Sequence, residues 1–268
     1  MTSTTAVPAA EAGVTRAVTE DGIATLTLAR PTRYNTLTSA VIADLSAHLA
    51  AIAADPAVRV VILASTGKAF STGHDLKEMN AARNEAFYRQ LFADCSRMMQ
   101  SIVALPQPVI AQVQGIATAA GCQLVATCDL AVAAASARFA TNGIQNGLYC
   151  ATPSVALSRV VQRKHALEML LTGDFIDAAR AAEMGLVNHV VPDAELETAT
   201  RALAGRIADK SQFAIRLGKA SFYRQVNQGL DSAYRGTSED LVCNLLAEDG
   251  QEGLDAFIAK RPPVWRDR

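Results

Sequence analysis

The stretch Val58-Arg59-Val60-Val61-Ile62-Leu63-Ala64 is followed, after a short turn, by Lys68-Ala69-Phe70-Ser71-Thr72-Gly73-His74-Asp75-Leu76-Lys77-Glu78. The first part is an apolar, largely β-branched run, typical of a strand buried on both faces of a parallel sheet. The second part leads into a helical pattern, so its Gly73-His74-Asp75 turn falls beyond the carboxyl end of a strand. Open α/β sheets bind ligands at that edge. This unit therefore predicts an α/β fold and marks a place for a ligand.

The same strand pattern recurs along the first two thirds of the chain. Val109–Val113 and Leu130–Ala134 are short apolar runs, and Gly185–Val191 is a weaker one. The segments between them are long enough for helices. Repeated β-α units with a largely parallel arrangement are therefore expected.

A hairpin and several helices complete the expected order of elements. Val14–Thr19 and Ile23–Leu28 alternate apolar and polar side chains around an Asp-Gly turn signal, which favours a hairpin. Leu37–Ala54 has apolar residues at helical spacing, with Thr38 or Ser39 as N-cap. No convincing strand follows Asp193. Helical patterns there cover Glu195–Ile207, Gln212–Gln225, Ser232–Leu246 and Gln251–Ile258.

Composition excludes several classes of protein. Of 268 residues, 50% are apolar and 19% charged, which indicates a globular chain and excludes a disordered or collagen-like one. The net charge of −1, without any long basic run, argues against a nucleic-acid binder. The most apolar stretch, Val109–Ala137, is interrupted by polar residues, so no membrane span is expected.

The cysteines and the N-terminus bear on the compartment. Five cysteines without a CxxC pair fit a reducing environment better than a disulfide framework or a zinc site, so no metal is expected. Residues 1–13 are rich in Thr, Ala and Pro and contain no basic residue. They resemble neither a signal peptide nor an Arg-rich transit peptide, so we expect a disordered tail and a cytoplasmic protein.

A second strand-then-helix segment runs from Gln114 to Leu124 and carries the small residues Ala119, Ala120 and Gly121 at the start of its helix. Small residues there let a ligand oxygen reach free N–H groups, where the helix dipole also favours negative charge. Together with the Gly73-His74-Asp75 turn, this predicts a two-donor oxyanion hole. Tight packing of helix against strand is the alternative explanation.

Common catalytic motifs are missing. The sequence contains no GxSxG, HExxH, P-loop or GxGxxG after a strand, so serine hydrolases, zinc proteases, NTPases and dinucleotide-binding enzymes have no support. His48, His165 and His189 are interpreted as ordinary helix or strand residues. His74 differs because it lies in the turn described above.

Several further motifs follow one another along the chain. They are Arg30-Pro31 with Asn35 and Leu37, Ala69-Phe70-Ser71-x-Gly73-x-Asp75-Leu76, Gly115 through Leu124 with Cys128-Asp129, and Lys260-Arg261-Pro262-Pro263-Val264-Trp265. Together and in this order they resemble the crotonase (enoyl-CoA hydratase/isomerase) superfamily. The resemblance implies a spiral of β-β-α turns over residues 14–195. It also implies a helical oligomerisation region over residues 196–268 that builds a homotrimer or a dimer of trimers.

The same resemblance implies a coenzyme A thioester as substrate and no resident cofactor. The thioester carbonyl is expected to bind the backbone N–H groups of His74 and Ala120, so that a thioester enolate is stabilised. The substrate-binding residues implied are Arg33, Ala69, Ser71, Gly73, Asp75, Leu76, Lys77, Ala119, Tyr149 and Lys260. Lys260 is expected to reach CoA phosphates on a neighbouring subunit, or else to be a solvated lysine.

Two positions depart from the family pattern. The two glutamates that hydratases of this family use align with Gln123 and Gly143. Neither residue supplies an acid or base near neutral pH. His74, Asn142, Gln145, Asn146, Tyr149 and Cys150 are candidates to replace them.

Three functions therefore stay open: a hydratase/isomerase-type enzyme, an acyl-CoA decarboxylase, and a non-catalytic acyl-CoA-binding protein. Installing glutamate at both positions is expected to raise hydration modestly.

Overall fold

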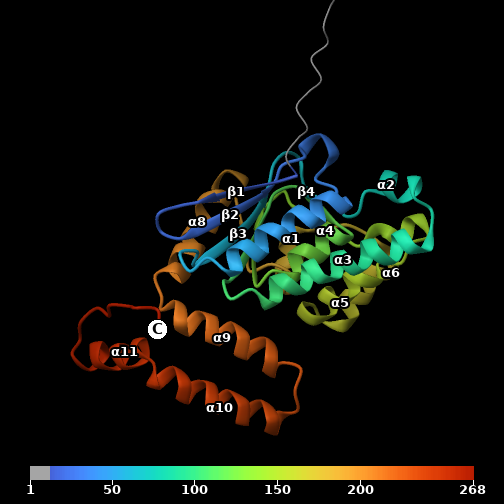
Figure 1. Cartoon of the computed structure of the whole chain (residues 1–268). Helices are drawn as coiled ribbons and strands as arrows, with labels where there is room; N and C mark the ends of the chain where they lie inside the picture. The colour runs from blue at the N-terminus through green and yellow to red at the C-terminus, as the bar shows by residue number, and fades with distance from the viewer. Residues whose placement is uncertain (1–12) are drawn as a thin grey trace, which may run out of the picture.

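The structure is a computed structural model and describes residues 13–268 (Figure 1). The tail expected over residues 1–13 lies outside the described residues except for Gly13. The carbonyl of Gly13 accepts a hydrogen bond from Ala29 N–H at 3.2 Å, so this residue is joined to the hairpin.

Two sheets form the body of the molecule. The larger sheet has the strand order β1-β2-β3-β5-β7-β10, and the smaller one β4-β6-β8-β9. The larger sheet contains β1 (Val14–Val18), β2 (Ile23–Leu28), β3 (Val60–Ser65), β5 (Val109–Val113), β7 (Leu130–Ala134) and β10 (His189–Val191). The smaller contains β4 (Ala69–Ser71), β6 (Ile116–Thr118), β8 (Arg138–Ala140) and β9 (Ile176–Asp177). Pairs β3-β4, β5-β6 and β7-β8 each contribute one strand to each sheet and lead into helices, which confirms the expected β-β-α spiral.

Strand pairing follows the expected directions. β1 and β2 form the antiparallel hairpin, and β2, β3, β5, β7 and β10 run parallel. The weak strand expected over Gly185–Val191 is shorter than predicted and begins only at His189. Gly185 has a φ of 83° and follows helix α7 (Ala178–Glu183), so the chain turns there before it enters the sheet.

Both faces of the larger sheet are covered, as the sequence of β3 predicts. Val61 and Leu63 belong to the main core, whereas Val60, Ile62 and Ala64 belong to a second apolar cluster on the other face. Helix α8 (Leu196–Ala208) covers this second cluster through Leu196, Ala204 and Ala208. The first helix of the region 196–268 is thus part of the body.

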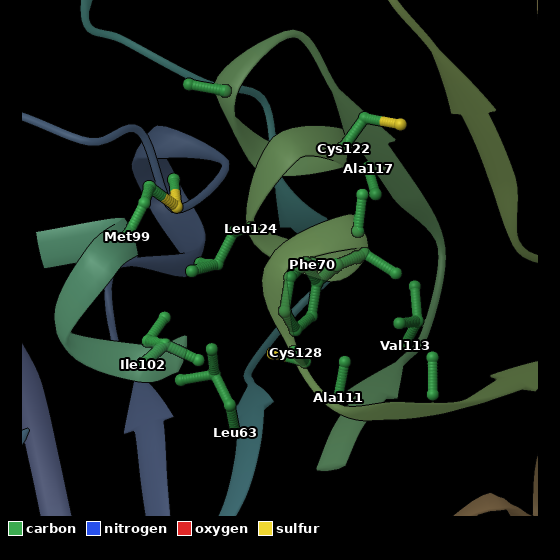
Figure 2. Packing of buried hydrophobic residues seen from close by; sticks show 14 of the residues in the cluster. Leu63, Phe70, Met99, Ile102, Ala111, Val113, Ala117, Cys122, Leu124 and Cys128 are labelled. Atoms are coloured by element: carbon green, nitrogen blue, oxygen red, sulfur yellow. The ribbon is translucent and has the colours of Figure 1, made fainter. Parts of the chain in front are cut away.

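The other helices of the body pack on the main core. They are α1 (Ser39–Ala53), α2 (Leu76–Ala81), α3 (Glu85–Ala104), α4 (Ala120–Thr127), α5 (Ala151–Val160), α6 (Arg163–Thr172) and α7 (Ala178–Glu183). Thr38 caps α1 by accepting a hydrogen bond from Val41 N–H. Phe70 of β4 is fully buried in the middle of this core, close to Leu124 of α4 and Val113 of β5 (Figure 2). It thereby fixes the residues that follow it, Ser71 to Gly73.

Helices α9 (Gln212–Gln225), α10 (Leu230–Leu246) and α11 (Glu248–Ile258) project from the body as an arm (Figure 1). Lys219 of α9 fastens the arm, because its ammonium donates to the carbonyls of Ile102 and Gln107 and, at 2.6 Å, to the Asp129 carboxylate. No strand follows His189–Val191 in the described chain, which confirms the all-helical last third. Between residues 13 and 268, no helix combines the length and apolarity that crossing a membrane requires.

Candidate functional site

The two turns singled out in the sequence lie in direct contact. β4 and β6, the strands that precede them, pair in parallel. A Cβ atom at Gly73, whose φ is 79°, would lie 2.9 Å from the amide nitrogen of Ala120. A Cβ atom at Gly121 would lie only 2.1 Å from the carbonyl oxygen of Ser71. Glycine is therefore required at both positions, and the tight-packing explanation holds for Gly121.

The contact leaves two backbone N–H groups without acceptors. Ala120 is the first residue of α4, so its N–H has no intrahelical acceptor. Within residues 13–268, neither this N–H nor that of His74 donates a hydrogen bond. Ala119 has a φ of 49° and a ψ of −120°, a conformation that is costly for a residue with a side chain. Its own N–H is held by the carbonyl of Ala140 at 3.0 Å, which keeps the turn in place.

Buried hydrogen bonds hold the first turn. The Ser71 hydroxyl donates to the carbonyl of Asn35 at 2.8 Å and accepts from Gly73 N–H at 3.3 Å. The Gly73 carbonyl accepts from Leu37 N–H at 2.8 Å. The Asn35 amide donates to the Ala69 carbonyl, also at 2.8 Å. Ser71 and Ala69, both expected to bind substrate, thus have structural partners in the turn itself.

The acidic side chains beside the first turn are committed to helix caps. Asp75 accepts hydrogen bonds from the N–H groups of Lys77 and Glu78 and from the Thr36 hydroxyl. Burial raises the pKa of Asp75, but these hydrogen bonds and the nearby Arg33 outweigh it and hold the pKa below its ordinary value. Glu78 accepts from the N–H of Ser39 at the start of α1. Neither carboxylate is a free acid or base.

The His74 side chain packs into the protein. Its ring meets Phe92 of α3 edge-on, with centroids 5.3 Å apart, and its buried Nε2 has no hydrogen-bond partner in the described chain. Burial lowers the pKa of His74 to about 4. The imidazole is therefore neutral at neutral pH.

The positions of the two family glutamates hold no acid. Gln123 lies on the first turn of α4, is 5% exposed, and has a buried Oε1 without a partner among the described residues. Gly143 lies in a 3-10 turn, η2 (Asn142–Asn146). A Cβ atom at Gly143 would lie 2.5 Å from the carbonyl oxygen of Leu148 and 2.9 Å from Sγ of Cys150. A side chain at this position therefore needs the chain around it to move.

The remaining predicted residues lie at different distances from the turns. Leu76 and Lys77 are exposed at the start of α2, and Arg33 is exposed in the 3-10 turn η1 (Pro31–Arg33). Tyr149 is 48% exposed on the segment after η2. Lys260 follows α11 on the arm, so a single chain does not bring it to the two turns.

Apart from His74, the residues proposed to replace the glutamates share the segment after β8. The side-chain amide of Gln145 donates to the carbonyl of Gly173, so it is used structurally. Burial raises the pKa of the Cys150 thiol, which keeps it protonated. Asn142 and Asn146 lie at the ends of η2.

Two residues near the turns were not predicted from the sequence to belong to the site. Phe92 carries no local signal, because its contact with His74 joins α3 to a distant turn. Thr141, fully buried and without a partner for its hydroxyl in the described chain, directly follows β8. The sequence carried no signal for it, because the strand before it, Arg138–Ala140, is too short to show a pattern.

A separate groove of about 520 Å³ lies between α1 and α3. It is lined by residues such as Ile42, Ser46, Asp94 and Met98, and it includes neither turn. It is therefore distinct from the candidate site.

Comparison with known proteins shows the family to which the chain belongs. The profile of the family described as "Enoyl-CoA hydratase/isomerase" matches residues 18–268. The chain belongs to the enoyl-CoA hydratase/isomerase family. A rat protein named enoyl-CoA hydratase domain-containing protein 3, mitochondrial, is 45% identical over 96% of this chain and 86% of its own length.

Solved structures of this family agree equally well. The crystal structure of an enoyl-CoA hydratase from Mycobacterium smegmatis has a TM-score of 0.94 and 49% identity, covering 95% of this chain and 99% of that chain. Human enoyl-CoA hydratase domain-containing protein 3 has a TM-score of 0.92 and 46% identity, covering 95% of this chain and all of the human one. The crotonase fold expected from the sequence is thereby confirmed.

Proposed function

We propose that this protein acts on acyl-CoA thioesters and stabilises a thioester enolate through the N–H groups of His74 and Ala120. The observation that carries the proposal is the contact between the two turns, which leaves these two donors unbonded beside each other. Donors fixed before the reaction stabilise charge that develops on a thioester oxygen, because they need no reorganisation. The α4 N-terminus adds a favourable dipole.

The missing carboxylates favour a reaction that needs the enolate more than a strong base. Position 143 has no room for a side chain, Gln123 is neutral, and Asp75 and Glu78 are engaged in caps. Decarboxylation of an acyl-CoA fits this set of groups, because loss of carbon dioxide generates the enolate directly. It is therefore the second candidate beside hydratase/isomerase chemistry. A mass-spectrometric screen of enoyl-CoA and carboxyacyl-CoA thioesters separates the two.

Ala120→Pro tests the proposal, because proline removes the N–H of residue 120 while its φ suits the first position of a helix. We expect turnover of any substrate found in the screen to fall about a hundredfold or more, the effect typical of losing one oxyanion donor. Leu230→Pro is the matched control: it also removes an N–H from the first residue of a helix, α10, far along the chain on the arm. Unchanged turnover in a folded Ala120→Pro protein, checked by circular dichroism, would refute the assignment. Binding of CoA thioesters without turnover of any of them indicates a non-catalytic acyl-CoA-binding protein.

We also propose that the arm assembles the protein into a homotrimer or a dimer of trimers. The arm exposes large apolar side chains, which a monomer leaves in water. They include Phe222, Val226, Leu241, Leu246, Phe257 and Ile258. Light scattering is expected to give the mass of three or six chains, and the mass of one chain at micromolar concentration would contradict this.

The location of the protein stays a prediction. The rat relative is named a mitochondrial protein, whereas the N-terminal composition of this chain favours the cytoplasm. Fractionation of cells that make the full chain tests it.

A further inference from the structure

The arm formed by α9, α10 and α11 has no share in the apolar cores of the body. Within residues 13–268, neither apolar cluster includes a residue beyond Ala208. The buried residues of the three helices are polar or small: Gln212, Ser221, Ala233, Asp249 and Ala256. Hydrogen bonds and ion pairs to the body therefore set the position of the arm in a single chain.

The base of the arm is fixed by Arg59, which directly precedes β3 in the body. Its guanidinium donates to the carbonyl of Ala208 at 2.8 Å and to the Asp267 carboxylate at 2.7 Å. Asp267 in turn accepts a hydrogen bond from the N–H of Gln212, the first residue of α9, at 2.8 Å. The beginning of α9 is thus joined to the body and to the C-terminal end of the chain, which lies beside it (Figure 1).

The last residues of the chain return from α11 to this base. Asp249 of α11 is buried and accepts hydrogen bonds from the N–H groups of Arg266 and Asp267, at 2.6 Å and 3.0 Å. The Trp265 indole N–H donates to the carbonyl of Asp209, between α8 and α9, at 3.1 Å. Both ends of the arm meet at one place, so a movement of the whole arm turns about that place.

A second attachment lies along α9, away from the base. Lys219 and Tyr223, one turn apart, both donate to the Asp129 carboxylate, at 2.6 Å and 2.8 Å. Lys219 also donates to the carbonyls of Ile102 and Gln107, at 3.0 Å each, so all three ammonium protons have acceptors. With side chains 7% and 14% exposed, Lys219 and Asp129 form the most buried ion pair between residues 13 and 268. We call Asp129, Lys219 and Tyr223 the latch.

The energetics of the latch differ from those of an ion pair inside a packed core. Removing one charge of a buried pair leaves the other charge without a partner, which costs more than the intact pair contributes. Burial already lowers the pKa of Lys219, because it disfavours the charged ammonium. If α9 separates from the body, the ammonium returns to water and no residue leaves an apolar cluster. The arm is therefore expected to respond to the loss of the Asp129 charge by leaving the body.

Resting on the proposed assembly, we infer that the latch is a conformational device that holds the arm, hinged at its Arg59-bound base, in the position in which it binds other copies of the chain. With the latch closed, the apolar side chains of the arm are presented in one fixed arrangement, so association requires no further ordering of the arm. With the latch open, the arm turns about its base while the body stays folded. Assembly then weakens, because each chain has to order its arm again before it binds.

Asp129→Asn tests the inference on the full-length protein, because it removes the charge at nearly constant shape. Hydrogen–deuterium exchange followed by mass spectrometry compares peptides of α9 with peptides of β2 and β3. We expect the amides of α9 to exchange at least about a hundredfold faster than in the parent, and those of β2 and β3 to exchange at the parent rate. In light scattering over a dilution series, the assembly is expected to dissociate at a concentration at least about tenfold higher than in the parent.

Two further variants separate the arm from the body, since Asp129 also accepts the N–H of Val109 in β5 at 2.7 Å. Tyr223→Phe removes a hydroxyl from the arm alone and is expected to speed exchange in α9 about tenfold. Asp129→Asn combined with Lys219→Met leaves no buried charge, so α9 is expected to exchange more slowly than in Asp129→Asn alone. Equal exchange in these two variants would show that the unpaired charge does not open the latch, and this overturns the inference.

Asp231→Asn is the matched control, because Asp231 also pairs with a basic side chain of the arm, Arg235, but this pair is exposed on α10. It should leave exchange and assembly as in the parent. Parent-like exchange of α9 in Asp129→Asn, or faster exchange of α9 and β3 alike, overturns the inference and leaves the proposed assembly standing. A released arm in an assembly as stable as that of the parent has the same consequence. A parent that is monomeric at micromolar concentration overturns the proposed assembly and the inference with it.

Discussion

The candidate site has a backbone half and a side-chain half that differ in how they are built. In the backbone half, around Gly73 and Ala120, glycine contacts and the Ser71 hydrogen bonds hold the two turns together, and the N–H groups of His74 and Ala120 donate to no group in residues 13–268. In the side-chain half, Gln123 and Thr141 are buried without partners, and Gly143 has no side chain. The comparison teaches that, in the proposed function, the donors that stabilise an enolate are backbone groups held by the fold, whereas the groups beside the acyl chain are a few replaceable side chains.

Gly121→Ala breaks the backbone half and is expected to have the largest effect on stability. Its Cβ would lie 2.1 Å from the backbone carbonyl of Ser71, so β4 and α4 have to separate. Overpacking of this kind costs about 3 kcal/mol in the free energy of unfolding, measured by urea denaturation. Gly218→Ala is the control, because nothing lies within 4 Å of that position on α9 and alanine favours a helix. Equal stability of Gly121→Ala and the parent would contradict the interlocked turns.

Gly143→Ala tests the side-chain half and is expected to cost about 2 kcal/mol of unfolding free energy. Its φ lies outside the left-handed region, so the obstacle is the contact with the Leu148 carbonyl and not backbone strain. The sequence alone predicted a modest gain in hydration when glutamate replaces both Gln123 and Gly143.

A Cβ atom at position 143 would lie 2.5 Å from the Leu148 carbonyl oxygen, so a glutamate there cannot hold its carboxylate where the family glutamate lies. The gain in hydration is therefore expected to be smaller than the sequence alone predicts. We now expect the double variant to hydrate crotonyl-CoA no faster than Gln123→Glu alone. A double variant that binds the thioester and gains a hundredfold over both single variants would show that position 143 accommodates glutamate.

Much of the fold and part of the site could be predicted from the sequence, for physical reasons that differ by element. β3 and β5 are short apolar runs buried on both faces, so their composition identifies them. β4, β6 and β8 have three residues each, too few for a pattern, and only the resemblance to the family implied that such second strands exist.

The two turns that carry the proposed oxyanion donors could be singled out in the sequence because Gly73 and Gly121 are locally visible. The contact of His74 with Phe92 and the missing space at Gly143 depend on residues far away or on backbone atoms. No local pattern reports them.

His74 joins the two halves, since its N–H belongs to one and its imidazole to the other. Burial lowers the pKa of the folded-state imidazole to about 4 from 6.5, so between these values the unfolded chain binds a proton that the folded chain does not. The stabilisation that the neutral imidazole gives the folded state is therefore lost as the pH falls through this window and is complete above about pH 6.5.

Between pH 7 and pH 5 the free energy of unfolding is expected to fall in the parent by about 2 kcal/mol more than in His74→Gln. Urea titrations at the two pH values measure it, and His48→Gln, at a partly exposed helix position, is the control. Parallel pH profiles of the parent and His74→Gln would contradict the burial of a neutral imidazole.

Ser71→Ala has the smallest expected effect and decides to which half Ser71 contributes. The family resemblance implies that Ser71 binds substrate, but its hydroxyl is fully buried and already joins the Asn35 carbonyl to Gly73 N–H. Losing these bonds is expected to lower the unfolding free energy by about 1 kcal/mol. Affinity for butyryl-CoA should fall less than about threefold, because the hydroxyl is fully buried and its one proton is already donated to the Asn35 carbonyl. Ser46→Ala is the control for stability, since its hydroxyl donates to the Ile42 carbonyl within α1 and lies outside both turns. A tenfold loss of affinity in Ser71→Ala, with stability as in the parent, would show instead that Ser71 leaves its backbone partners and contacts the thioester.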